Sequence, residues 1–274
     1  MSFKIGRNCK IDSTAVIDVK DGFLGDNSIV NAFARIEGTR VEIGREAYID
    51  RFATIGGGSC FDPTAYLKAG DWFHMGTHSQ VNIARGVDVG HEFGCGIESK
   101  IFTHGAYTDS YNLGAPVQWA PVKIGNHVWL PNAWVNPGVE IGDHVVVAAR
   151  SLVNRDLPKG SLAGGIPAKI LKENFLPRAI SQEEKTSLLE EICHMAWLRF
   201  CDTKKIDVNS EKLFSIKIDK IIVFDDGLES VFHMQRKEIQ GIASDLSLLI
   251  KDQLRRNGIR FRYEAIEQKW TSWK

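Results

Sequence analysis

The sequence lacks the features that would place it in a membrane or outside the cell. None of its five cysteines belongs to a C-x-x-C pair, and their number is odd, so we expect reduced thiols and no disulfide framework. No apolar run approaches the roughly 18 residues of a membrane span. The first residues, MSFKIGRNCKIDSTAV, contain no apolar run of signal-peptide length. We therefore expect a cytoplasmic protein that does not insert into a membrane.

An excess of charge is also absent. The 34 Lys and Arg residues balance 34 Asp and Glu residues, which gives a formal net charge of +0. A neutral chain has no overall field that would gather nucleic acid or coat an anionic membrane, so we expect neither partner. With 43% hydrophobic and 25% charged residues, the 274-residue chain can bury the core of one large domain or two ordinary ones.

What the sequence does contain is a six-residue repeat of apolar positions, often followed by Gly and then by Asp or Asn. A period of six matches neither a helix nor a simple two-residue alternation. It fits a coil of short flat sides with one inward residue per side, in which Gly, Asn or Asp adopts left-handed corner conformations. An ordinary antiparallel sandwich would have no reason to keep this period. The series are Ile5, Ile11, Ile17; Leu24, Val30, Ile36; Ile43, Ile49, Ile55, Phe61, Leu67, Phe73; Ile83, Val89, Cys95, Ile101; and Ile124, Leu130, Ile141, Val147.

Three segments near the end of the repeat region, IGNHVW, NPGVEIGDHVVVAARS and GGIPAK, follow one another in this order. With them, residues 1–173 resemble a hexapeptide-repeat acyltransferase, most closely over residues 101–173, and the sugar and polysaccharide O-acetyltransferases in particular. The resemblance implies a mainly β fold, a left-handed parallel β-helix of triangular cross-section. It also implies a homotrimer with coenzyme A bound in grooves between neighbouring subunits.

Composition changes after the repeats, and we predict a small α+β domain over residues 178–274. Ser181 and Glu184 have the spacing of a capping box ahead of a helical apolar pattern. Strand-like alternation follows in FSIKIDKIIVFDD and LESVFHMQ. A second helix is predicted from Ser244 to Gly258, followed by a strand in IRFRYEAI. This domain contains no catalytic motif, and packing or oligomerisation is its expected role, with acceptor binding or partner docking as the alternative.

The repeat is interrupted after Ile101, and His104 stands at the interruption. A neutral imidazole suits proton removal from an attacking hydroxyl. Of the eight histidines, His104 matches the catalytic histidine of the family, so the resemblance implies that it is the general base. Its other ring nitrogen needs an orienting partner. Glu98 and Asp109 are the nearest acids in sequence, and a backbone carbonyl is an equal alternative.

The interrupting loop, residues 104–121, is long enough to suggest a function. Its Tyr107, Asp109, Tyr111 and Trp119 combine apolar faces with polar groups, which suits a sugar. We predict that these four residues bind a carbohydrate acceptor. The alternative is that the aromatic side chains only fix the loop to a neighbouring subunit.

The same resemblance implies contacts with acetyl-coenzyme A as the acyl donor. Trp129 matches a tryptophan beside the thioester end, and Ala148 matches a position where the backbone meets the pantetheine arm. The GGIPAK motif, with Gly165, Pro167 and Lys169, matches a loop near the adenine and 3′-phosphate, where Lys169 would supply a point charge.

Two features depart from the family pattern. Where the family has A-A-G-S, this chain has AARS, so Arg150 replaces a glycine beside the expected cofactor groove and would either bind a phosphate or crowd the groove. The rung from Leu130 to Ile141 is also one residue short of two repeats. One side of that rung must therefore have five residues, which affects the wall around Trp134.

The leading hypothesis is an acetyl-coenzyme A-dependent O-acetyltransferase acting on a sugar hydroxyl of a nucleotide sugar, an oligosaccharide or a surface polysaccharide unit. The acceptor could instead be the amino group of an amino sugar or an antibiotic. A different class is a metal-dependent hydratase resembling γ-type carbonic anhydrases, with His74, His78 and His104 as ligands. That reading leaves GGIPAK and the long loop without a task, and we expect no metal. A non-catalytic trimeric scaffold is the remaining alternative.

Overall fold

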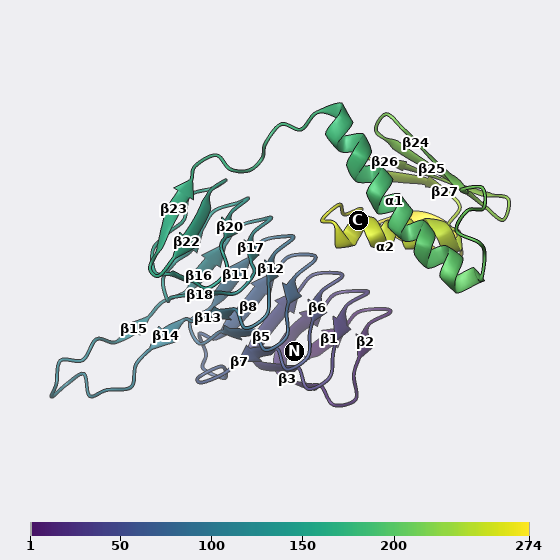
Figure 1. Ribbon diagram of the computed structural model, residues 1–274. Coiled ribbons are helices and arrows are strands. Elements are labelled where there is room, and N and C mark those ends of the chain that lie inside the picture. Colours follow the sequence, from purple (N-terminus) through teal and green to yellow (C-terminus); the bar gives the residue numbers. More distant parts are fainter. Residues whose placement is uncertain (1, 274) are drawn as a thin grey trace. The chain divides into compact units, whose positions relative to one another are not determined.

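The computed structural model describes residues 2–273 and divides into two compact units, Met1–Arg178 and Ala179–Lys274 (Figure 1). The first unit is a left-handed parallel β-helix, as the sequence predicts. Its short strands stack coil upon coil, and each strand pairs in parallel with the corresponding strand of the next coil.

Two parallel sheets form the sides of the coil. The first sheet contains β1 (Phe3–Ile5), β3 (Val16–Leu24), β5 (Arg35–Ile43), β7 (Thr54–Gly56), β8 (Tyr66–Ala69), β10 (Gln80–Asn82), β11 (Val87–Val89), β13 (Lys100–Ile101), β16 (Val122–Ile124), β18 (Ala133–Val135), β19 (Glu140–Ile141) and β21 (Ser151–Val153). The second contains β2 (Lys10–Ile11), β4 (Ile29–Val30), β6 (Tyr48–Ile49), β9 (His74–Met75), β12 (Gly94–Cys95), β17 (Trp129–Leu130), β20 (Val146–Val147), β22 (Leu162–Gly165) and the antiparallel β23 (Ala168–Lys172).

Three columns of inward side chains fill the coil, and the ladder register defines them. Column one is Ile5, Leu24, Ile43, Ala69, Val89, Ile124 and Ile141. Column two is Ile11, Val30, Ile49, Met75, Cys95, Leu130, Val147 and Ala163. Column three is Ile17, Ile36, Ile55, Val81, Ile101, Val135 and Val153. Ile5 and Ile11 remain 52% and 36% exposed because the first coil has a neighbour on one side only.

The predicted register was wrong between residues 61 and 83. The predicted series continues through Phe61, Leu67 and Phe73 and restarts at Ile83, whereas the column positions there are Ala69, Met75 and Val81. Residues 57–65 leave the coil as a loop, but the six-residue spacing from Ile55 to Phe61 treats them as part of the coil. Phe61 is consequently 41% exposed, although Leu67, Phe73 and Ile83 are still buried next to the columns.

The shortened rung is confirmed and located. Leu130 and Val135 occupy neighbouring columns and are five residues apart, so the side that carries Trp134 is the short one. Trp134 faces outward and contacts Phe102 edge-on, with ring centroids 6.0 Å apart.

The turns that follow column one form what we call the glycine corner: residues 6–8, 25–27, 44–46, 70–72, 90–92, 125–127 and 142–144. The sequence predicts left-handed Gly, Asn or Asp at such corners. The left-handed residues are the third ones, which are Asn8 and Asn27 in the first two turns but residues such as Glu92 and His127 in later ones, and none of the glycines of these turns is left-handed. The glycines are needed for space. A Cβ on Gly90 would lie 2.7 Å from Asn126 Oδ1, which accepts a hydrogen bond from the His91 amide of the coil beside it.

The passage from column three back to column one forms the loop corner. It contains residues 82–86 and two excursions, residues 57–65 and residues 104–121. The longer excursion leaves through β14 (His104–Gly105) and returns through β15 (Gln118–Trp119), an antiparallel pair that projects from the coil (Figure 1). Both excursions therefore start at the same edge of the β-helix.

The second unit combines α1 (Gln182–Lys204) and α2 (Asp245–Arg256) with a sheet of β24 (Phe214–Lys217), β25 (Lys220–Asp225), β26 (Leu228–His233) and β27 (Glu238–Gly241). Both helices start where their caps predict, and Ser181 and Glu184 form the capping box. The last predicted strand is shorter than expected, with β28 (Tyr263–Ile266) paired to β29 (Lys269–Ser272). No helix formed by residues 2–273 has the length and apolar character of a bilayer span.

Candidate active site

The coil anchors His104 at the loop corner. Ile101, at the end of β13, is fully buried in column three, and Thr103 is also fully buried. His104 follows them as the first residue of the longer excursion and is half-buried. The residues that precede His104 are therefore part of the rigid core, whereas the residues that follow it leave the core.

Asn82 orients the His104 ring. Asn82 Oδ1 lies 3.0 Å from His104 Nδ1 and accepts a hydrogen bond of 2.6 Å from the Thr103 hydroxyl. Asn82 Nδ2 donates to the Gly58 carbonyl at 3.3 Å, which fixes which end of the amide faces the histidine. Because the facing atom is an acceptor, Nδ1 of His104 carries the proton, and Nε2 keeps its lone pair.

Sequence reasoning missed Asn82 as this partner. Glu98 lines a groove at a different corner, and Asp109 forms hydrogen bonds within the excursion. The signal that was available is an Asn directly after the apolar position Val81, in a run that otherwise fills the core. Asn82 is only 3% exposed, and a buried amide requires hydrogen-bond partners.

Trp119 covers one side of the histidine. It pairs with His104 across β14 and β15, and the two rings stack with centroids 4.6 Å apart and an interplanar angle of 13°. The guanidinium of Arg85 lies 4.3 Å from the Trp119 ring centroid. The indole thus connects the imidazole to a cation from the preceding coil.

The edge of the imidazole that carries Nε2 approaches Gly58. A Cβ added at Gly58 would lie 3.8 Å from both Nε2 and Cε1, with no other atom within 4 Å. The run Gly56–Gly58 brings the backbone of the shorter excursion close to His104 and Asn82, and Gly57 adopts a left-handed φ of +92°. The space beside Nε2 is bounded on this side by a residue without a side chain.

Of the four residues predicted to bind the acceptor, the structure brings only Trp119 against His104. Tyr107 and Tyr111 are 103% and 94% exposed on the projecting excursion. Asp109 accepts hydrogen bonds from the amides of Tyr111 and Asn112, both at 2.9 Å, and so shapes the loop's own turn. These bonds, chiefly the backbone bond from Asn112, lower the pKa of Asp109.

Except for Trp129, the residues expected to bind the acyl donor lie at the corner between the second sheet and column three. Ser151 Oγ donates to the Ala148 carbonyl at 2.7 Å and accepts from the Gly165 amide at 3.0 Å. Arg150, with a left-handed φ of 57°, borders a groove of about 700 Å³ together with Lys100, Trp134 and Ile166. Pro167 follows Ile166 through a cis peptide bond, and Lys169 is exposed on β23.

Trp129 lies apart from this cluster. It points outward from the second sheet with 43% of its surface exposed, and its ring lies over Gly94, where a Cβ would be 2.6 Å from the indole. His104 leaves the first sheet at the loop corner. The β-helix of one subunit therefore presents these two residues on different faces.

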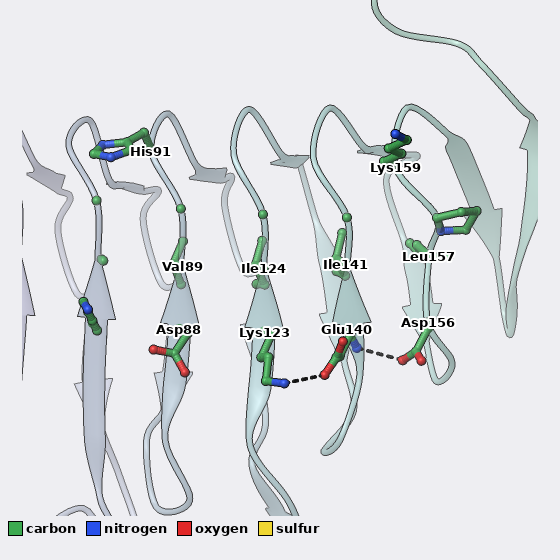
Figure 2. A pocket seen from close by; sticks show the side chains of 17 residues that line it. Asp88, Val89, His91, Lys123, Ile124, Glu140, Ile141, Asp156, Leu157 and Lys159 are labelled. Carbon is green, nitrogen blue, oxygen red and sulfur yellow. Dashed lines mark hydrogen bonds and ion pairs between the residues drawn. The ribbon is translucent and has the colours of Figure 1, made fainter.

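A groove of about 860 Å³ lies on the outward face of the first sheet, and none of the predicted site residues lines it (Figure 2). Its side chains carry charges of both signs. Lys123 Nζ pairs with Glu140 Oε1 at 2.6 Å, and Asp156 accepts a hydrogen bond of 2.8 Å from the Glu140 amide. Because these side chains are exposed and pair with one another, we do not assign a function to this face.

The three histidines of the hydratase hypothesis lie in different parts of the coil. His74 belongs to β9 and stacks on Tyr48 at 5.2 Å, while His78 stacks on Phe52 at 4.9 Å at the corner after column two. Among residues 2–273, no group of three or more His, Cys, Asp or Glu side chains has the arrangement of a metal site.

Comparison with known proteins gives relatives for the coil. Over 139 residues the chain is 30% identical to the galactoside O-acetyltransferase of Escherichia coli (strain K12), which is 47% of this chain and 68% of the relative. It is 32% identical over 120 residues to the putative lipopolysaccharide biosynthesis O-acetyl transferase WbbJ of the same strain, 39% of this chain and 57% of that protein. A chloramphenicol acetyltransferase of Morganella morganii is 40% identical over 75 residues, 27% of this chain and 33% of that protein.

Among solved structures, the AntD N-acyltransferase from Bacillus cereus, in complex with dTDP and coenzyme A, superimposes with a TM-score of 0.47 at 19% identity, covering 68% of this chain and 90% of that chain. No family model matches the sequence.

Proposed function

This chain belongs to the hexapeptide-repeat acyltransferases, and on that premise we propose that it transfers an acetyl group from acetyl-coenzyme A to a sugar hydroxyl, with His104 as the general base. The observation that carries the proposal is the contact of 3.0 Å between Asn82 Oδ1 and His104 Nδ1, from which the tautomer of the neutral imidazole follows. Asn82 Oδ1 binds Nδ1–H, and Nε2 is left as a proton acceptor at the loop corner.

In the proposed reaction, the acceptor hydroxyl gives its proton to His104 Nε2 as its oxygen attacks the thioester carbonyl. The tetrahedral intermediate then collapses and expels the coenzyme A thiolate, which takes up the proton held by Nε2. The transfer leaves an O-acetyl sugar, free thiol and the histidine in its original tautomer. Holding the two substrates together supplies a large part of the rate.

We assign the acyl donor to the corner formed by Ala148, Arg150 and Gly165, with Pro167 and Lys169 at the 3′-phosphate end. Ser151 packs this backbone tightly, so a pantetheine arm can run along it, and Arg150 and Lys169 add positive charge for phosphates. Lys169→Ala should weaken coenzyme A binding but leave that of 3′-dephospho-coenzyme A unchanged. Equal weakening of both ligands, measured by calorimetry, would contradict this contact.

We also propose a homotrimer with the active sites between subunits. Within one subunit, His104 lies at the loop corner and Trp129 on the outward face of the second sheet, so in the trimer a neighbouring copy would bring the second residue to the same thioester. Tyr107 and Tyr111, exposed on the projecting loop, are available to contact the acceptor or the neighbouring copy. The five free cysteines fit a reducing cytoplasm, which is where we place the reaction.

Thiol release from acetyl-coenzyme A tests the function directly. The purified chain would be assayed against a panel of neutral sugars, uronic acids, sugar phosphates, amino sugars, nucleotide sugars and oligosaccharides, with product mass to distinguish O- from N-acetylation. Acceptor-dependent thiol release supports the proposal. If no acceptor promotes release and millimolar coenzyme A fails to raise the melting temperature, the chain is a scaffold and not an enzyme.

A further inference from the structure

The guanidinium of Arg85 is held through one of its three nitrogens, Nη1. It lies at the loop corner between the two excursions, and its Nη1 donates to the Ala84 carbonyl at 2.9 Å and to Thr64 Oγ1 at 3.0 Å. Asp62 Oδ2 lies 3.4 Å from the same nitrogen. The shorter excursion, through Asp62 and Thr64, therefore fixes the guanidinium through one nitrogen only.

The other two nitrogens of Arg85 remain available. Within residues 2–273, neither Nε nor Nη2 has a hydrogen-bond partner, and 31% of the side chain is exposed. These two nitrogens form the edge of a guanidinium that binds both oxygens of a carboxylate or phosphate at once. Stacking on Trp119, at 4.3 Å, restricts rotation of the guanidinium plane.

Arg85 and His104 both contact Trp119, and both lie against the shorter excursion, Arg85 at Thr64 and the Nε2 edge of His104 at Gly58. The imidazole and the guanidinium each lie within 4.6 Å of the Trp119 ring centroid. Their separation is at most the sum of those two distances, a span that one sugar ring and its hydrogen bonds can bridge. The protein has no net charge, so a cation at this position acts locally and is not part of a general field.

We propose that the acceptor is an anionic sugar, whose carboxylate or phosphate binds the Nε–Nη2 edge of Arg85 while its hydroxyl reaches His104 Nε2. The inference rests on the proposed acetyl transfer and adds the class of the acceptor. Among residues 2–273, Asp62 is the carboxylate that contacts Arg85, and it lies beside Nη1, away from the free edge. The alternative role for Arg85 is a brace that joins Thr64 of one excursion to Trp119 of the other.

Matched acceptors separate the two roles. Thiol release would be measured for methyl glucuronide against methyl glucoside, methyl galacturonide against methyl galactoside, and galactose 1-phosphate against methyl galactoside. We expect the acidic member of at least one pair to have a kcat/KM about 10- to 100-fold higher, the range of a charge-assisted pair of hydrogen bonds. The uronate and phosphate pairs show which oxyanion is preferred.

Variants then test whether Arg85 causes the preference. Arg85→Gln should reduce kcat/KM for the acidic acceptor by about 10- to 100-fold and bring it to that of its neutral partner, and Arg85→Lys should retain part of it. Thr64→Val removes one hydrogen-bond acceptor of Nη1 and leaves the Nε–Nη2 edge of Arg85 unchanged. It should change the rates with acidic and neutral acceptors by the same factor.

The outcomes are distinct. Equal kcat/KM for acidic and neutral acceptors in the wild type, or an equal loss for both in Arg85→Gln, would overturn the anionic acceptor and leave acetyl transfer standing. Absence of acceptor-dependent thiol release with every compound would instead refute the proposed function.

Discussion

Two corners of the β-helix, the glycine corner and the loop corner, use their polar side chains in different ways. At the glycine corner, Asp26, Asp71, Asn126 and Asp143 each accept a hydrogen bond from a backbone amide of the neighbouring coil, at 2.6–2.9 Å. At the loop corner, Asn82 serves two side chains, Thr103 and His104, and its amide nitrogen reaches an excursion. The glycine corner joins neighbouring coils, and the loop corner holds the imidazole of His104.

Histidines at the two corners show the consequence. His127 lies at the glycine corner, stacks on His144 at 4.8 Å and pairs with Glu92 at 3.2 Å, so its neighbours are structural residues of adjacent coils. His104 has one nitrogen held and the other facing a glycine. A histidine by itself therefore does not identify the site. The arrangement of groups around its two ring nitrogens does.

The largest expected effect separates these two histidines. His104→Ala should lower kcat about 10²- to 10⁴-fold with little change in coenzyme A affinity, because a general base contributes about this much. The measurement is steady-state thiol release together with calorimetric binding. His127→Ala is the matched control and should stay within about threefold of wild type. Similar losses in both variants would remove the distinction between the corners.

Asn82 gives the next largest effect. Asn82→Ala should reduce kcat about 10- to 100-fold, since the imidazole loses the acceptor that sets its tautomer. Asn82→Asp keeps an oxygen for Nδ1–H and should recover part of the loss. The ¹⁵N chemical shifts of His104 would report the tautomer in each variant. Full activity in a correctly folded Asn82→Ala protein would disprove the orienting role.

Gly58 should show a smaller effect, confined to the acceptor. The methyl group of Gly58→Ala would sit 3.8 Å from His104, an ordinary contact that the fold tolerates. It would nevertheless occupy the space beside Nε2, and we expect about a tenfold lower kcat/KM for the acceptor with the KM for acetyl-coenzyme A unchanged. Gly105→Ala is the control, because its added Cβ meets no atom within 4 Å. Equal values for the two variants would mean that the acceptor approaches elsewhere.

The glycine corner should affect stability and not activity. Asp143 accepts hydrogen bonds from the amide and side chain of Asn126, and the backbone bond is the main reason that its pKa is lowered. Asp143→Ala should cost about 1 kcal/mol of unfolding free energy at neutral pH. A lowered folded-state pKa stabilises above about pH 4 and loses its contribution as the pH falls below that value. Urea titrations should therefore show the gap between wild type and variant narrowing from pH 6 to pH 3.

The sequence predicts most of the fold because each coil repeats the same burial requirement. Inward residues such as Ile49 and Ile101 recur at a fixed spacing, and a period of six admits few architectures. The register failed between residues 61 and 83, once residues 57–65 had left the coil, because Phe61 and Leu67 continue the count by coincidence of spacing. Period alone does not distinguish a core position from an apolar residue on a loop.

The candidate site was less predictable because its geometry depends on contacts between coils. His104 could be found from its place after Ile101. Asn82 and Gly58 could not, since each is more than twenty residues away and meets the histidine only when neighbouring coils stack. The role of Trp119 likewise depends on the pairing of β14 with β15, which brings both ends of a long loop together.

The two excursions have a consequence for how such a chain can change. An unbroken ladder of paired strands runs beside both excursions through Ile55, Val81, Ile101 and Val135. The ends of each loop are therefore fixed by strand pairs outside the loop. Closing a longer loop between fixed ends costs only about 0.6 kcal/mol for each doubling of its length. Insertions and deletions at residues 106–117 can therefore accumulate at small thermodynamic cost. Related chains can diverge in what they acetylate while His104 and the ladder beneath it stay in place.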